Sequence, residues 1–285
     1  MSYAHPTSLV STEWLSLNMS APDVRIVDAS WYMPAENRNP RAEFNAAHIP
    51  GAVFFDIDDI ADTDVDLPHM IPAPEKFSSK MRKLGLGDGN RIVVYDGAGI
   101  RSAARAWWML RLFGHADVAI LDGGLPKWQV EGRDITDLPT LPKERHFTSR
   151  INSLLVKDKD QVLRNIDSAK AQVLDARSKG RFDGVEAEPR PGLRGGHIPG
   201  SANLPFNELI TEGGTLKPAA ELKSAFEAAN INLKKPVITT CGSGITACVL
   251  AFGLHMLGHR DTAVFDGSWT EWGLDDALPI EDGAS

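Results

Sequence analysis

The residue best suited to covalent chemistry is Cys241, in the segment Val237-Ile-Thr-Thr-Cys-Gly-Ser-Gly-Ile-Thr246. The first four residues of this segment predict a short buried strand, and a helix is predicted to start at about Thr246. Open parallel sheets bind ligands at the carboxyl ends of their strands, where this cysteine would lie. Small loop residues let several backbone N–H groups turn inward, and these groups and the helix dipole favour a thiolate over a thiol. The loop therefore predicts a reactive cysteine.

Other roles for this loop fit less well. Residues 242–247 match the Gly-x-Gly-x-x-Ala dinucleotide fingerprint, but they lie in the last quarter of the chain and that role leaves Cys241 unused. A cysteine phosphatase would close the loop with an arginine, where this chain has Thr246 and Ala247. A plain core position is the ordinary role of a cysteine, and it suits Cys248, which faces into the predicted helix.

An internal duplication organises the chain. Four segments recur in the same order at offsets of 144 to 149 residues: Ile26–Ser30 with Val173–Arg177, His48–Ala52 with His197–Ser201, Tyr95–Ile100 with Thr240–Ile245, and Leu121–Gly124 with Phe265–Ser268. The second pair reads His-Ile-Pro-Gly in both copies. Such ordered self-similarity predicts two copies of one domain.

Each copy alternates short apolar runs with longer amphipathic ones. In the second copy, strands are predicted at 173–175, 202–204, 237–240 and 263–265, and a helix that opens with proline at 218–229. This alternation predicts α/β domains, each a parallel sheet with helices on both faces. We expect a first domain at residues 1–140, a linker at 141–160 and a second domain at 161–285.

Composition narrows the classes of function. The formal charge is −8, from 30 Lys and Arg against 38 Asp and Glu, which argues against a surface for nucleic acid or anionic membrane. The most apolar stretch, 247–257, is too short to span a bilayer, and the first residues lack the apolar run of a secretory signal. Two cysteines make no disulfide framework. We therefore expect a cytoplasmic protein without nucleic-acid or membrane partners.

The repeated segments, the cysteine loop and Asp266-Gly-Ser-Trp-Thr-Glu-Trp272 resemble the tandem-domain rhodanese family over nearly the whole chain. The loop Cys-Gly-Ser-Gly-Ile-Thr is similar to the version in 3-mercaptopyruvate sulfurtransferases, whereas thiosulfate-using rhodaneses typically have Cys-Arg-Lys-Gly-Val-Thr. The resemblance implies that only the second domain is catalytic. Asp96, which stands in the first copy where the second has Cys241, agrees with this.

The resemblance also implies a set of site residues. Asp58 and His69 match the family's Asp–His pair, and with Ser243 they would handle protons beside Cys241. By local pattern alone, each of these residues outside the loop would equally fit an ordinary surface position. The substrate-binding residues implied are Arg181 and Arg190 for a carboxylate, and Gly242, Gly244, Ile245 and Thr246 in the loop.

The function that the resemblance implies is sulfur transfer. A persulfide on Cys241 would carry sulfur from 3-mercaptopyruvate to an acceptor and release pyruvate. The acceptor would be a small thiol or thioredoxin, and neither a metal nor an organic cofactor is expected. Two alternatives remain open, a thiosulfate sulfurtransferase and a non-catalytic sulfur-relay module.

Overall fold

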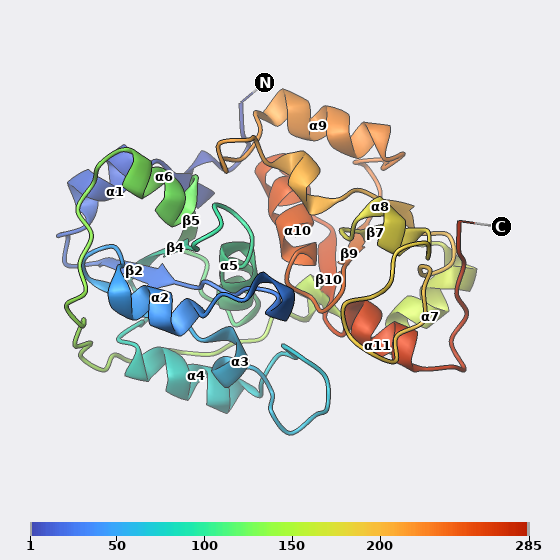
Figure 1. Ribbon diagram of the computed structural model, residues 1–285, viewed down its shortest axis with the longest axis horizontal. Helices are drawn as coiled ribbons and strands as arrows, with labels where there is room; N and C mark the ends of the chain where they lie inside the picture. The colour runs from blue at the N-terminus through green and yellow to red at the C-terminus, as the bar shows by residue number, and fades with distance from the viewer. Residues whose placement is uncertain (1, 284–285) are drawn as a thin grey trace.

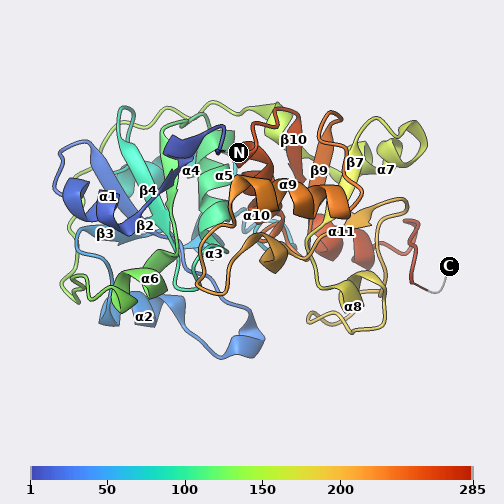
Figure 2. The same cartoon turned by 90° about the horizontal axis from the view of Figure 1, so that it is seen from above.

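The two copies of the repeat form two domains that lie side by side in the computed structural model, which describes residues 2–283 (Figures 1 and 2). Each domain contains a five-stranded sheet, ordered β1-β5-β4-β2-β3 in the first and β6-β10-β9-β7-β8 in the second. All neighbouring strands pair in parallel. The two orders correspond strand for strand, so the predicted duplication and the predicted α/β fold are confirmed.

The elements of the first domain alternate as the repeat pattern requires. Its strands are β1 (Leu9–Val10), β2 (Val24–Asp28), β3 (Ala52–Phe54), β4 (Arg91–Tyr95) and β5 (Val118–Leu121). Its α-helices are α1 (Thr12–Asn18), α2 (Pro40–Ala46), α3 (Ile57–Ile60), α4 (Pro74–Lys83), α5 (Ala103–Leu112) and α6 (Gly124–Val130). Two 3-10 turns, η1 (Pro6–Ser8) and η2 (Pro34–Glu36), precede α1 and α2.

The second domain repeats this alternation. Its strands are β6 (Val156–Lys157), β7 (Gln172–Asp175), β8 (Ala202–Asn203), β9 (Val237–Thr240) and β10 (Thr262–Phe265). Its helices are α7 (Lys159–Ser168), α8 (Lys179–Phe182), α9 (Ala219–Ala228), α10 (Ala247–Met256) and α11 (Ser268–Leu274), with 3-10 turns η3 (Ser153–Leu155) and η4 (Phe206–Leu209). The predicted strands are confirmed as β7 to β10. The predicted helices are confirmed as α9, which Pro218 directly precedes, and α10.

Both faces of each sheet are buried, which explains why the strands read as continuous apolar runs. In β2, Ile26 packs into one hydrophobic cluster and Val27 into another on the opposite face. Helices α1 and α6 cover the first of these faces, and α3, α4 and α5 cover the second. In the second domain α7 and α11 cover one face of the sheet, and α9 and α10 the other.

Helices α5 and α10 join the two domains. Nine of the ten residues of each helix are buried, as expected for helices that are apolar on nearly every side. They contact each other between the two sheets (Figures 1 and 2), and Trp107 meets Phe252 edge to face with ring centroids 4.9 Å apart. Their side chains belong to one hydrophobic cluster that runs through both domains. The domain contact therefore resembles a protein core.

Two aspartates at equivalent positions of the repeat form hydrogen bonds between the domains. Asp266 Oδ2, at the end of β10, accepts a hydrogen bond of 2.7 Å from the backbone N–H of Ile71 in the other domain. Its counterpart Asp122, at the end of β5, accepts one of 2.9 Å from Leu216 N–H. An ion pair reinforces the first contact, because Arg105 of α5 lies 2.7 Å from Asp266. Both side chains of that pair are buried.

The chain between the domains follows the first domain before it enters the second. Phe147 is buried against Phe77, and Arg150 N–H donates to Phe113 O at 2.9 Å. β6 lies within the range predicted as linker but pairs with β10 in the second sheet. The domain limits given from the sequence stay predictions.

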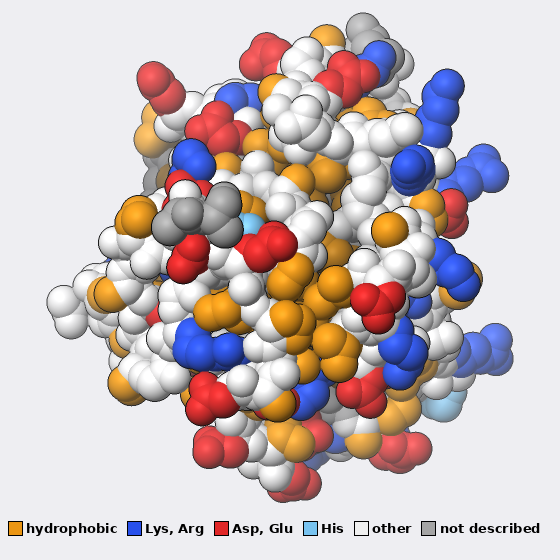
Figure 3. Space-filling model, turned by 90° about the vertical axis from the view of Figure 1, so that its right-hand side faces the viewer, with side chains coloured by type: hydrophobic (Ala, Val, Ile, Leu, Met, Phe, Trp, Pro, Cys, Tyr) orange, Lys and Arg blue, Asp and Glu red, His pale blue; other side chains and the backbone are white. Residues whose placement is uncertain are grey.

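The surface of the second domain is mixed in character. On the face in Figure 3, hydrophobic side chains gather near the middle, with acidic and basic side chains around them. Within residues 2–283, no helix is long and apolar enough to cross a membrane.

The buried ion pair between the domains predicts a large effect of Arg105→Met on stability. We expect the free energy of unfolding to fall by about 3–5 kcal/mol, because Asp266 is left as an unpaired buried charge. Thermal and urea unfolding, followed by circular dichroism, measure the loss. The control is Arg82→Met, whose pair with Glu144 is 3.7 Å long and more than half exposed (51% and 63%) and is worth under about 1 kcal/mol. Equal losses in the two variants would contradict a structural role for the buried pair.

Candidate active site

Cys241 directly follows β9, in the loop that leads to α10. It lines a cavity of about 270 Å³ whose walls come from both domains. The start of α11 holds the loop from behind: Trp269 N–H donates to Cys241 O at 2.9 Å, and Thr270 N–H donates to Gly242 O at 2.8 Å. Ser268 Oγ accepts from the Cys241 N–H at 3.2 Å. The loop carbonyls are thereby turned toward α11.

The sequence predicts that the backbone N–H groups of this loop form an anion-binding nest. Within residues 2–283 the N–H groups of residues 242–246 have no hydrogen-bond acceptor, so they are unpaired. In the first domain the matching N–H groups of Ala98 and Arg101 both donate to the carboxylate of Asp96, each at 2.8 Å. Asp96 thus fills its own nest with a negative charge. In the second domain the Cys241 side chain makes no such bonds among the described residues, and the matching N–H groups remain unpaired.

Gly244 is required in this loop by its backbone and by its neighbours. Its φ is +78°, in the left-handed region that glycine adopts without strain. A Cβ atom there would lie 2.7 Å from Asp266 O and 2.9 Å from Arg105 Nη1. The Arg105 guanidinium also donates to Gly244 O at 3.2 Å, so the ion pair between the domains supports the loop directly.

The predicted Asp58, His69 and Ser243 come together across the domain boundary. His69 Nδ1 lies 3.0 Å from Ser243 Oγ, and His69 Nε2 lies 3.2 Å from Asp58 Oδ1. Trp31 Nε1 donates to the other carboxylate oxygen of Asp58 at 3.1 Å. A carboxylate only accepts, so His69 Nε2 must carry a proton. His69 Nδ1 also lies 3.2 Å from the Ser243 carbonyl oxygen. In the neutral ring Nδ1 accepts from the Ser243 hydroxyl, and in the doubly protonated ring it donates to the hydroxyl or the carbonyl oxygen.

Strain accompanies this contact. His69 has φ +64°, which is uncommon for a residue with a side chain and often marks a functional position. Arg105 donates to the His69 carbonyl and so fixes the backbone on this side. Burial would raise the pKa of Asp58, but the hydrogen bond and charge of His69, together with Trp31 and Arg190, lower it below the usual value. Asp58 is therefore a carboxylate at neutral pH.

The predicted Arg181 and Arg190 both line the cavity with Cys241, but their surroundings differ. Arg181 Nη2 donates to Glu188 Oε2 at 2.6 Å, and Glu188 Oε1 also accepts from the buried Arg177 at 2.7 Å. Within the described residues no hydrogen bond or ion pair engages Arg190. Burial lowers the pKa of Arg190, and Cys241 is the neighbouring group that most opposes this shift. Arg190 is thus the uncommitted cation of the cavity.

Cys248 has the core position that the sequence indicated. It is fully buried on α10, and its Sγ lies 3.2 Å from Gly244 O, to which it donates. Burial raises the pKa of the Cys248 thiol well above its usual range, against the attraction of Arg105.

Several residues of the site were not found from the sequence. Arg105 holds the loop, Glu188 orients Arg181, and Trp31 and Arg101 reach the cavity from the first domain. Arg105 carries a local signal, a lone cation in the apolar run Ala103-Ala-Arg-Ala-Trp-Trp. The others lie in loops whose composition gives no such signal.

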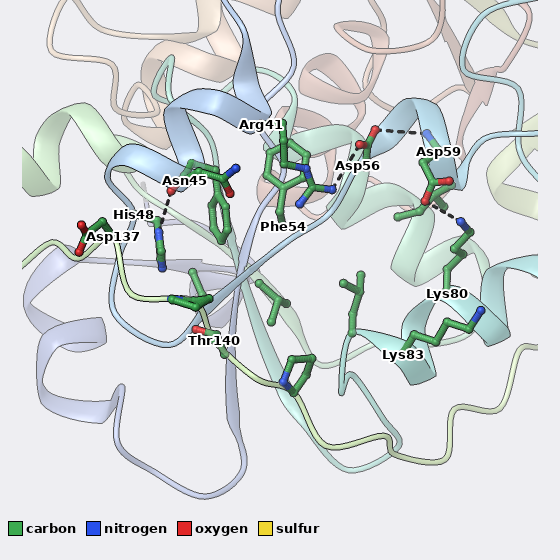
Figure 4. A pocket seen from close by; sticks show the side chains of 17 residues that line it. Arg41, Asn45, His48, Phe54, Asp56, Asp59, Lys80, Lys83, Asp137 and Thr140 are labelled. Carbon is green, nitrogen blue, oxygen red and sulfur yellow. Dashed lines mark hydrogen bonds and ion pairs between the residues drawn. The ribbon is translucent and has the colours of Figure 1, made fainter.

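A larger cavity of about 560 Å³ lies in the first domain, away from the cysteine (Figure 4). Four of the charged groups drawn there form two pairs, Arg41 with Asp56 at 3.4 Å and Lys80 with Asp59 at 2.5 Å. It contains no cysteine or serine and shares no residue with the cavity of Cys241. The larger of these two cavities is therefore not the one that contains the candidate reactive cysteine. Among the described residues, no three His, Cys, Asp or Glu side chains are grouped to hold a metal ion.

Comparisons with known proteins bear on both domains. The sequence model of the rhodanese-like domain matches residues 11–131 and 158–275. The Arabidopsis thaliana protein named thiosulfate/3-mercaptopyruvate sulfurtransferase 1, mitochondrial, is 46% identical over 96% of this chain and 78% of its own length. Human 3-mercaptopyruvate sulfurtransferase is 40% identical over 93% of this chain and 91% of its own.

A solved structure agrees with these matches. SseA from Escherichia coli, described as a 3-mercaptopyruvate sulfotransferase with the rhodanese fold, superposes with a TM-score of 0.85. It is 40% identical, over 92% of this chain and 98% of its own.

The different settings of the two cysteines predict selective alkylation. Iodoacetamide is expected to modify Cys241, which lines a cavity, at least about a hundredfold faster than Cys248, because the raised pKa of Cys248 leaves little thiolate. Intact-mass and peptide mass measurements at pH 7.5 count and locate the adducts, with Cys241→Ser as the control. A modified Cys248 in the folded wild-type protein would contradict the assignment.

Proposed function

This chain belongs to the rhodanese family, and from that premise we propose that it transfers sulfur from 3-mercaptopyruvate to a thiol through a persulfide on Cys241. The observation that carries the proposal is the open nest of N–H groups around Cys241, beside the uncommitted Arg190. The N–H groups can accommodate a negatively charged persulfide, and Arg190 can bind a carboxylate.

Donor binding begins with the carboxylate of mercaptopyruvate. Arg190 supplies a guanidinium without a competing partner, and Arg181, oriented by Glu188, supplies a second one. Paired charge-assisted bonds to a planar carboxylate fix its orientation as well as its position. The sulfur at the other end of this short molecule then lies toward Cys241.

Sulfur transfer forms one bond and breaks another. The Cys241 thiolate attacks the donor sulfur, the new S–S bond forms, and the electron pair of the C–S bond leaves with carbon as pyruvate enolate. The Ser243 hydroxyl gives this carbon a proton, and the proton lost by the donor thiol returns to Ser243 through His69. The products are pyruvate and a persulfide anion, so charge and protons balance. The loop N–H groups hold the new anion.

The second half of the reaction restores the enzyme. An acceptor thiolate attacks the outer sulfur of the persulfide, and the S–S bond to Cys241 breaks to return its thiolate. A small thiol and thioredoxin are both acceptors of this kind. The sulfur stays covalently attached between the two steps, so the proposed route uses no metal or organic cofactor. A cytoplasmic location remains a prediction, and the Arabidopsis relative is named as mitochondrial.

Thiosulfate is the alternative donor, and the surroundings of Gly242 favour mercaptopyruvate over it. A Cβ atom on residue 242 would lie 3.0 Å from Arg181 Nη2. A loop with Arg-Lys after the cysteine would therefore place new cations against Arg181 and Arg190 and remove the Ser243 hydroxyl. Thiosulfate, a dianion whose leaving group needs no proton, gains from such cations, whereas mercaptopyruvate loses the proton donor. The non-catalytic relay module, the second alternative, gives no role to the contact between His69 and Ser243.

Activity with the two donors tests the proposal. We expect kcat/KM for mercaptopyruvate to exceed that for thiosulfate at least a hundredfold, about 2.7 kcal/mol in transition-state stabilisation.

Mass measurement after incubation with mercaptopyruvate alone should find one added sulfur atom on Cys241. Cys241→Ser should have neither the added sulfur nor the activity, and Cys248→Ser should keep both. The double change Gly242→Arg, Ser243→Lys should shift preference toward thiosulfate. Equal or better wild-type activity with thiosulfate would exclude mercaptopyruvate as the preferred donor. An unmodified Cys241 would exclude the persulfide mechanism.

The arginines of the cavity give a separate prediction. We expect kcat/KM for mercaptopyruvate to fall roughly tenfold to more than a hundredfold in Arg190→Ala and in Arg181→Ala. Each change removes a charge-assisted bond to the carboxylate, which is worth about 1.5–3 kcal/mol. Persulfide transfer to a small thiol, measured from preloaded enzyme, should fall less. The control is Arg164→Ala, an exposed arginine on α7. Unchanged mercaptopyruvate kinetics in both cavity variants would remove these residues from donor binding.

A further inference from the structure

A second cavity, of about 240 Å³, lies where the two domains meet and shares no residue with the cavity of Cys241. The first domain contributes Trp107, Trp108 and Arg111 of α5, and the second contributes His255 of α10. The segment before β1 adds His5, whose ring stacks on His255 with centroids 4.2 Å apart. The proposed reaction uses none of these side chains.

Charge is the unusual property of this cavity. Arg111 and Arg260 line it, and no Asp or Glu does, although the chain as a whole has a formal charge of −8. Burial alone lowers the pKa of Arg111, with no carboxylate near enough to oppose the shift. The more deeply buried Arg105 and Arg177, in contrast, both pair with carboxylates. A half-buried cation without a counter-charge is unfavourable unless a ligand supplies one.

The histidine beside Arg111 does not supply that charge. Arg111 Nη1 donates to His255 Nε2 at 3.0 Å. Burial, with the charges of Arg111 and His5, lowers the pKa of His255 to about 3, so this ring is neutral at physiological pH. His255 therefore accepts a hydrogen bond and leaves the positive charge of Arg111 uncompensated.

The aromatic walls give the second, independent observation. Trp107 is 3% exposed, and its Nε1–H is buried without a hydrogen-bond partner among the described residues. Trp108, by contrast, donates its Nε1–H to Leu155 O at 3.0 Å. The Trp107 N–H is itself inaccessible, so Trp107 lines the cavity through the rest of its ring. The Arg111 guanidinium stacks 4.8 Å from the Trp107 ring centre, so a cation and a flat apolar surface lie together.

We propose that this cavity is a second ligand site, which binds a small organic anion with a flat, unsaturated body, such as an aromatic carboxylate. The carboxylate meets Arg111, and the ring packs on the aromatic side chains. The ligand touches α5 and α10 at once. Arg105 lies on α5 nearer its start, and α10 begins at the catalytic loop, so an occupied cavity ties together the two helices that support the active site.

Benzoate is a probe of this chemistry. We expect saturable binding by isothermal titration with a dissociation constant of about 1 mM or lower, and a raised thermal midpoint, because the ligand binds only the folded protein. Benzyl alcohol, which has the ring without the charge, should bind at least tenfold more weakly. Arg111→Gln should weaken benzoate binding at least tenfold, and Trp107→Phe, which leaves a smaller flat ring for the ligand to pack on, about threefold or more.

Two controls separate this site from other anion sites. Arg41→Gln changes another arginine that stacks on an aromatic ring, Phe54, in the cavity of Figure 4, and should bind benzoate like wild type. Protein alkylated on Cys241, whose active-site cavity is blocked, should also keep its benzoate affinity. Sulfur-transfer activity of Arg111→Gln without ligand reports that the variant is folded.

Each outcome decides the proposal. Binding that survives alkylation of Cys241 and is lost in folded Arg111→Gln supports it. Absence of saturable binding to wild type overturns it, as does equal affinity in Arg111→Gln or loss of binding after alkylation. If Arg111→Gln does not fold, Trp107→Phe takes its place, and an unchanged affinity in that variant overturns the proposal.

Discussion

The buried ion pair between Arg105 and Asp266 is the interaction on which the site depends. One guanidinium, from the first domain, reaches the carboxylate at the end of β10, the carbonyl of Gly244 in the cysteine loop and the carbonyl of His69. The second oxygen of the same carboxylate receives Ile71 N–H, two residues after His69. The segment that carries His69 and the loop that carries Cys241 are thus held by one pair of charges. Because His69 has a strained backbone, its conformation requires such external support.

The two domains have the same fold but carry different residues at equivalent positions of the loop, so they can have different roles. The loops after β4 and β9 keep the same nest of N–H groups, but Asp96 occupies the first with its own carboxylate. A carboxylate that accepts these hydrogen bonds satisfies the loop permanently and leaves no reactive atom. With cysteine at this position the N–H groups of residues 242–246 have no acceptor among the described residues, and in the proposed mechanism a sulfur anion supplies one. The first copy therefore acts as a support. It contributes Trp31 and Arg101 to the cavity of Cys241, and its His69, bound to Asp58, contacts Ser243 of the cysteine loop.

The parts of the structure that were predictable are those set by local pattern or by repetition. The strands, the helix after Cys241 and the two-domain fold follow from apolar periodicity and from four ordered repeats. Asp58, His69 and Ser243 were matched through the family, and their contact across the domains depends on packing that no local pattern contains. Glu188 was missed because a carboxylate in a polar loop looks exposed, yet its side chain is 1% exposed between Arg177 and Arg181. Arg105 was missed because its partners lie in three segments distant in sequence.

Charge pairing explains how an acidic chain presents a cationic site. Most of its buried arginines are neutralised locally: Arg177 by Asp175 and Glu188, and Arg181 in part by the same Glu188. Such pairing fixes a guanidinium in space but reduces its pull on a ligand, because the hydrogen bonds are already made. Arg190 lacks this pairing, and its lowered pKa reflects the cost of a partly buried charge, which a bound anion would reduce. Arg111, at the other cavity between the domains, is likewise a partly buried arginine without a carboxylate partner, and burial lowers its pKa. Because a distant net charge is screened by solvent while a buried unpaired cation is not, local pairing and not the total of −8 determines where this protein can hold an anion.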